Sequence, residues 1–168
     1  MKMRAAIFVY NLICNIPVCF CLCFAASVVG VSNLENGVLT IQFNNILWLN
    51  TLYNFLIGFT IAMLIGNFVP LTKIGRWFTG LFHVKNDTYT GNMPYRLLAT
   101  LIITLIFYVG ITPALTLFNY LIGVYTTPAQ AGISMLISLP IMLLVGFTSS
   151  LINDIAAYKV AHMIDADF

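Results

Sequence analysis

Four apolar runs, each longer than the roughly 20 residues that a helix needs to cross a bilayer, dominate this chain of 168 residues. They cover residues 5–31, 45–70, 97–123 and 131–157. Only 7% of the residues are charged and 61% are hydrophobic, whereas soluble domains carry about 25% charged residues. A soluble fold has no place for so much apolar surface. The sequence therefore predicts an all-α membrane protein, with four transmembrane helices in one domain, 1–168.

The lysines and arginines all fall on one side of this predicted domain. They are Lys2, Arg4, Lys73, Arg76, Lys85, Arg96 and Lys159. Four spans place both termini and the connection 71–95 on the same side, and the seven basic residues lie in or beside those segments. Because basic residues concentrate in cytoplasmic segments of membrane proteins, the sequence predicts that both termini are cytoplasmic. It places Glu35 and Thr127 outside and His83 inside.

The connection 71–95 begins with an amphipathic pattern. Its apolar residues are spaced i, i+3, i+4, i+7: Ile74, Trp77, Phe78 and Leu81. This spacing predicts a short helix. We expect it to lie on the membrane surface, with Lys73, Arg76 and Trp77 among the lipid headgroups. A loop that binds a partner protein is the alternative.

The second apolar run carries small and polar residues in steps of four, which are neighbours along one helix face. They are Asn50, Asn54, Gly58, Ala62 and Gly66. The fourth run repeats such a face, with Gly146 and Ser150 in it. Because small residues let helices approach closely in lipid, the pattern predicts a helix-packing ridge. We expect homo- or hetero-oligomers to form through such faces.

The two halves of the chain are similar to each other. Placing Gly30 on Gly123 aligns the first and third runs, and placing Gly58 on Gly146 aligns the second and fourth. Both copies start and end on the same side, so a parallel repeat of two helix pairs is predicted, related by an axis along the membrane normal. Its parts are repeat 4–70, the amphipathic cytoplasmic loop 71–95, repeat 96–158 and a short tail, 159–168.

Several residues at fixed places in the first half resemble a family of short bacterial membrane proteins of unknown function, with two helices per copy. These are Arg4, Pro17, Ser27, Gly30, Trp48, Gly58, Phe59 and Pro70. The second half departs from the pattern, because Leu136 aligns with Trp48 and Tyr158 with Pro70. The resemblance implies a tandem copy in the bacterial inner membrane. It implies no activity and no site residues.

Polar residues on the predicted helices have two interpretations. Their side chains can bond neighbouring helices to one another, or they can line a polar cavity. The candidates for the cavity are Asn11, Asn15, Thr104, Tyr108 and Ser138. In the predicted orientation Ser138 lies in the outer half of the membrane and the other four in the inner half, so one continuous path needs both sets.

Catalytic, cofactor and metal sites are not indicated. His83 and His162 fall at the predicted cytoplasmic edges, and the four cysteines share the first run without further ligands. No acidic residue is expected at mid-membrane. Asp154 is predicted at the inner boundary, in reach of water and near Lys159, where Asp154→Asn would leave folding and activity largely intact. The small net charge of +2 does not suggest nucleic acid.

These patterns favour a small polytopic membrane protein that acts by interaction, in contact with membrane lipids and with a partner subunit or further copies of itself. The alternative is a passive or weakly coupled carrier or channel for a small neutral solute. A lipid-handling enzyme is disfavoured, since no acid/base pair is evident.

Overall fold

The computed structural model describes residues 2–31, 33–35, 38–40, 43, 45–84 and 92–166. Its elements are α1 (Lys2–Val31), β1 (Asn33–Glu35), β2 (Val38–Thr40), α2 (Asn45–Phe68), α3 (Leu71–Leu81), α4 (Met93–Leu121) and α5 (Pro128–Ile164). The helices α1, α2, α4 and α5 are long and apolar enough to span a membrane. The predicted helical architecture with four candidate spans is thus confirmed.

Two features of the fold were not expected from the sequence. The first is α5, which continues to Ile164 through most of the segment predicted as a tail. Ala157 and Ala161 are fully buried, and so is Ala6 on α1, the helix against which α5 packs. Alanine is the best helix former and allows close helix packing, so α5 extends although its hydropathy falls. The second is the connection after α1, where β1 and β2 form an antiparallel hairpin that was not predicted.

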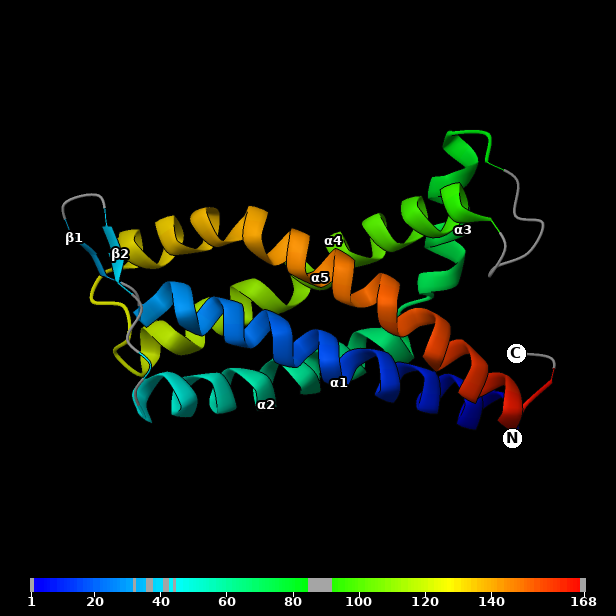
Figure 1. The fold of residues 1–168 in the computed structure, drawn as a ribbon, viewed down its shortest axis with the longest axis horizontal. Coiled ribbons are helices and arrows are strands. Elements are labelled where there is room, and N and C mark those ends of the chain that lie inside the picture. The colour runs from blue at the N-terminus through cyan, green and yellow to red at the C-terminus, as the bar shows by residue number, and fades with distance from the viewer. Residues whose placement is uncertain are drawn as a thin grey trace.

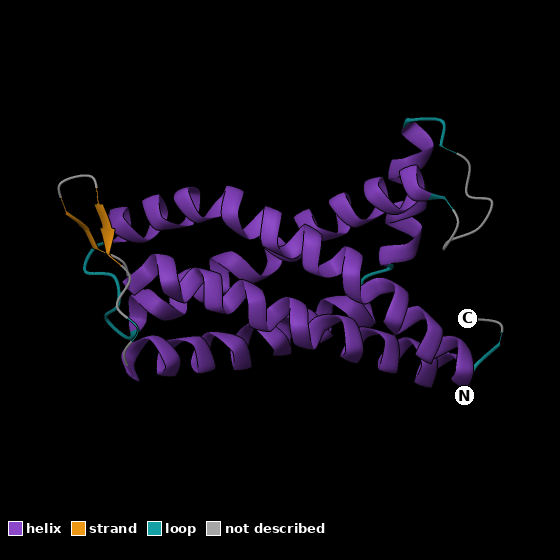
Figure 2. Ribbon diagram, viewed as in Figure 1, coloured by secondary structure: helices purple, strands orange, loops and turns teal. Residues whose placement is uncertain are grey.

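The elements are arranged along one long axis (Figures 1 and 2). Both termini and α3 lie at one end, and the hairpin lies with the α4–α5 connection at the other. The helix α3 runs across the bundle axis. All lysines and arginines of the described segments lie in α3 or in the parts of α1, α4 and α5 that are at the α3 end of the bundle. Lys85 lies outside the described residues.

Single cysteines at His83 and Thr127, in a background without native cysteines, should react with a membrane-impermeant maleimide from opposite sides of a vesicle. Both residues are exposed, and they lie beyond opposite ends of the bundle, after α3 and before α5. The measurement is the labelled fraction in vesicles of both orientations. Labelling of both positions from the same side would contradict the arrangement of four spans.

The four long helices form a closed ring. The helix α1 packs against α2 and α5, and α4 packs against the same two helices and against α3. Two apolar clusters fill the middle of the ring. One contains Cys19, Cys23, Ala62, Ile111 and Leu115, and the other contains Leu22, Tyr108 and Met142. We call these two clusters together the apolar septum, because polar regions lie on both sides of them.

The small residues of the ridge face neighbouring helices of the same chain. A Cβ atom added at Gly58 would lie 3.3 Å from Cys23 Sγ, and one at Gly146 would lie 3.2 Å from side-chain atoms of Leu22 and Thr104. Ala62 is fully buried. On α2 and α5, these residues therefore allow the close approach of α1 and α4.

Candidate functional site

A cavity of about 780 Å³ lies inside the ring, in the half nearer α3 and the termini. All five helices contribute to its wall, and the segment between α2 and α3 completes it. Polar lining residues include Tyr10, Asn11, Asn15, Thr100, Thr104 and Ser150. Pockets for small organic ligands usually enclose about 300–1,000 Å³, so this cavity has the size of a ligand site.

The cavity ends at the apolar septum. Its deepest lining residues include Leu22 on α1, Phe107 on α4 and Gly146 on α5. Leu22 also belongs to the septum, where it packs with Tyr108 and Met142. The cavity is thus bounded by apolar side chains toward the hairpin end of the bundle.

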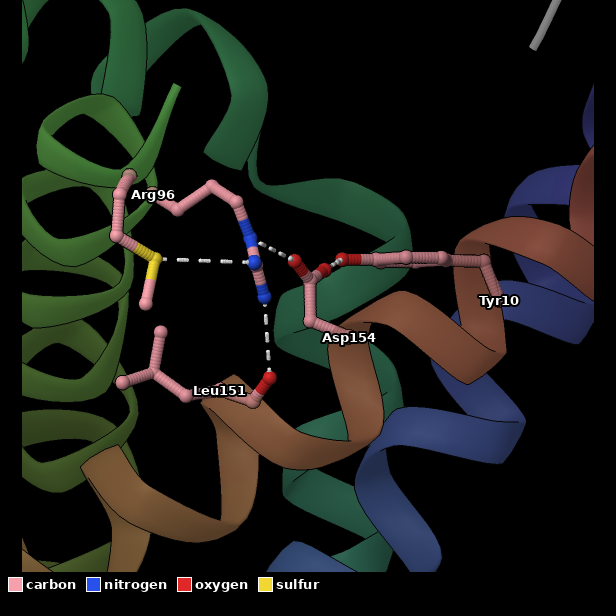
Figure 3. Close-up of polar contacts among 5 residues, drawn as sticks. Tyr10, Arg96, Leu151 and Asp154 are labelled. Carbon is pink, nitrogen blue, oxygen red and sulfur yellow. Dashed lines mark hydrogen bonds and ion pairs between the residues drawn. The ribbon is translucent and has the colours of Figure 1, made fainter. Parts of the chain in front are cut away.

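Two buried residues of opposite charge, Arg96 and Asp154, meet beside the cavity (Figure 3). Asp154 on α5 is 3% exposed and lines the cavity. The Tyr10 hydroxyl on α1 donates a hydrogen bond to Asp154 Oδ1. Arg96 on α4 lies on the other side of the carboxylate, with 3.8 Å between Arg96 Nε and Asp154 Oδ2. One carboxylate therefore joins three helices.

The guanidinium of Arg96 has further partners. Its Nη2 donates a hydrogen bond of 3.2 Å to the carbonyl oxygen of Leu151, one turn before Asp154 on α5. Its Nη1 lies 4.0 Å from the sulfur of Met93. Arg96 is itself only 7% exposed. Because a buried charge is costly unless it is paired and hydrogen-bonded, Arg96 and Asp154 stabilise each other inside the bundle.

The position of Asp154 corrects the sequence-based expectation of a solvated residue near Lys159. The helix α5 continues well beyond Asp154, and α1 packs along it, so protein covers the carboxylate. Its partner is Arg96, while Lys159 is exposed. The expectation failed because it placed the end of the helix too early.

The polar residues proposed for a cavity fall into two groups. Asn11, Asn15 and Thr104 line the cavity. Tyr108 and Ser138 are not among its lining residues. Both instead donate hydrogen bonds to the carbonyl oxygen of Met135, at 2.8 and 3.0 Å. They lie at and beyond the septum, so the five residues do not share one space.

A second polar cluster lies on the hairpin side of the septum and joins α1, α2 and α4. Asn54 is 1% exposed. Its Nδ2 donates to Ser27 Oγ at 3.3 Å and to Asn50 Oδ1 at 3.4 Å, and its Oδ1 accepts from Asn119 Nδ2 at 3.0 Å. Sequence reasoning missed Asn119, because it singled out only Thr104 and Tyr108 among the uncharged polar residues of that helix.

The helix α3 presents two different faces. Gly75 and Thr79 are buried, and a Cβ atom at Gly75 would lie 3.5 Å from the Cβ of Ala99 on α4. Lys73 and Trp77 are exposed, and Arg76 is an exposed residue that also lines the cavity. The exposed face of α3 thus combines basic and apolar side chains.

Among the described residues, no group of three His, Cys, Asp or Glu side chains could hold a metal ion. No model of a known protein family matches the chain, and neither the curated proteins nor the solved structures contain a significant match to it.

Proposed function

We propose that this chain is a membrane carrier that binds a small organic solute in the cavity and releases it on the other side, passively or with weak coupling. The observation that supports it is a cavity of ligand size, about 780 Å³, which is lined by both polar and apolar side chains and ends at an apolar septum. A helix bundle that only packs against partners has no need of such a space.

A carrier needs a second state in which the septum opens and the cavity closes. Three helices contain a proline close to the septum: Pro17 in α1, Pro113 in α4 and Pro140 in α5. Proline removes a backbone hydrogen bond and allows a helix to bend. We propose these positions as the hinges of the transition.

The proposed orientation places the cavity on the cytoplasmic side of a bacterial inner membrane. The basic residues at the α3 end support it through the positive-inside rule. On the exposed face of α3, Trp77 is 64% exposed, beside Lys73. Such a face suits the headgroup region, so we propose α3 as an interfacial helix. The tandem two-helix family and the parallel repeat remain predictions from the sequence.

An interaction module or partner subunit is the second candidate. Leu81 and Phe82 are 57% and 56% exposed at the end of α3, and these side chains could contact another subunit. The two candidates differ in what happens to the septum. An interaction module keeps it closed, whereas a carrier must open it.

Two single cysteines test the carrier, each in a background without native cysteines. Ser150→Cys lies in the cavity wall, so an impermeant maleimide should label it from the side that labels His83→Cys and, when the septum opens, from the opposite side as well. Thr112→Cys lies beyond the septum in the wall of a small hollow and is 5% exposed, so it should react slowly and only from the opposite side, whether or not the septum opens. Leu144→Cys, 66% exposed on the outer surface of the bundle, is the control that faces lipid.

The labelled fraction over time separates the candidates. Labelling of Ser150→Cys from both sides, with Thr112→Cys labelled from one side only, supports a carrier. Labelling of Ser150→Cys only from the side that labels His83→Cys would show a binding cavity without transport and would favour the interaction module. An unreactive Ser150→Cys on both sides would mean that the cavity has no access to water, which contradicts both binding and transport.

A further inference from the structure

We propose that the solute is a small organic anion, whose oxygen atoms meet Asn11, Arg76 and the start of α3 in the cavity. This inference rests on the proposed function, because it names the ligand class for the same cavity. It replaces the neutral solute suggested by the sequence.

The first observation is an unsatisfied donor. Asn11 lines the cavity and is 6% exposed, and its Nδ2 has no hydrogen-bond partner within the described part of the chain. Its side chain lies against the backbone of α2, since a Cβ atom added at Gly66 would come within 2.9 Å of Asn11. A buried donor without a partner costs free energy. The Nδ2 atom is covered in this position, so a ligand oxygen would satisfy it once the Asn11 amide rotates toward the cavity that the residue lines.

The second observation is the position of the start of α3. Val69, Pro70, Leu71 and Thr72 all line the cavity, so the first turn of this helix faces it. No side chain caps this helix end. The N–H groups of Leu71 and Lys73 already donate to the carbonyl oxygens of Val69 and Pro70, so the N–H of Thr72 and the helix macrodipole are what favour negative charge at this end. The start of α3 therefore adds a positive potential on the cavity side.

The third observation is the balance of charge in the wall. Of the described residues that line the cavity, Arg76 and Asp154 are the charged ones. The charge of Asp154 is offset by Arg96 and its Oδ1 is occupied by Tyr10. Arg76 forms no ion pair with another described residue. The uncompensated charge in the wall is thus positive.

The rest of the wall indicates the body of the ligand. Ile7 and Val18 on α1 face the cavity together with Ile103 and Phe107 on α4. These side chains suit an aliphatic or aromatic group, while Asn11 and Arg76 suit a carboxylate or similar acceptor group. An amphipathic anion satisfies both parts of the wall.

Three probes that share one body and differ in charge test this inference: 3-phenylpropanoate, 3-phenylpropan-1-ol and 3-phenylpropylammonium. The measurement is protection of Ser150→Cys from the maleimide in the purified, full-length protein, with Thr100→Cys as a second reporter in the same cavity. We expect the anion to reach half protection at a concentration about tenfold below that of the alcohol, the ratio that one charged contact of about 1.4 kcal/mol supplies. The cation should protect least.

A matched pair of variants on α3 locates the effect. Arg76→Gln should weaken protection by 3-phenylpropanoate severalfold, whereas Lys73→Gln, which removes an exposed charge three residues away, should leave it unchanged. Equal protection by all three probes, better protection by the cation, or no protection at all while Ser150→Cys and Thr100→Cys still react would overturn the anion. Unreactive cysteines at both positions would instead overturn the proposed function on which this inference rests.

Discussion

Asp154→Asn should lower the free energy of unfolding by about 3–5 kcal/mol, the range seen when one partner of a buried ion pair is removed. The side chains of Arg96 and Asp154 are 8% and 5% exposed, so the variant leaves the guanidinium buried with a neutral neighbour. The hydrogen bond from Arg96 Nη2 to the carbonyl oxygen of Leu151 remains, but this oxygen is neutral and does not replace the negative charge of the carboxylate. Equilibrium unfolding in mixed micelles, followed by tryptophan fluorescence, measures the loss.

Two controls separate the ion pair from a general effect of substitution. Asn153→Asp places an additional acid at the neighbouring position, which is not fully buried, and should change stability by less than Asp154→Asn. The double variant Arg96→Met with Asp154→Leu removes both charges, and replacing a buried pair by apolar residues is often nearly neutral. We therefore expect it to be more stable than either single variant. An Asp154→Asn protein as stable as the wild type would show that the carboxylate is solvated.

The sequence was sufficient for the four spans because each apolar run is long and the connections are polar. It also placed both termini and α3 at the same end of the bundle, as Figure 1 shows. Both features depend on local composition and on the number of spans. Neither requires knowledge of which side chains meet between helices.

The centre of the site could not be predicted, because it depends on the register between helices. Asp154, Arg96 and Tyr10 lie on three different helices, and no local pattern links them. A shift of α5 by one turn against α4 would separate the carboxylate from the guanidinium. The relative depth of two helices is set by packing, such as that of Ala157 and Ala161 within the bundle.

The polar residues predicted to line one cavity are divided between the cavity and the septum for a similar reason. A four-residue step overshoots the 3.6-residue turn of a helix, so a row such as Thr100, Thr104 and Tyr108 winds around α4. Thr104 faces the cavity, while Tyr108 turns to the carbonyl oxygen of Met135. The hairpin carried an available signal that was not used. Asn36-Gly37 stands directly before the β-prone stretch Val38-Leu39-Thr40, and Asn-Gly favours two-residue hairpin turns.

The septum depends on α2 approaching α1 and α4 closely, which makes Gly58 a position where added volume has a large expected effect. Gly58→Leu should destabilise the protein by about 3 kcal/mol or more, the upper range for overpacking of a filled core. Already the first added carbon would lie 3.3 Å from Cys23 Sγ and 3.5 Å from Ile111 Cγ2. The three remaining carbons of leucine have no space between them.

The matched control for this prediction is the same substitution at Gly132, where a Cβ atom would meet nothing within 4 Å. Gly132→Leu should be neutral or slightly stabilising, since leucine is a better helix former than glycine. Leu56→Val, on a side chain of α2 that is 53% exposed, should also be mild. Unfolding in mixed micelles gives the free energies, and size-exclusion chromatography in detergent gives the oligomeric state. Equal and small losses for Gly58→Leu and Gly132→Leu would show that α2 does not pack against α1 and α4 through Gly58, because an interface of that kind cannot absorb a leucine without separating the helices.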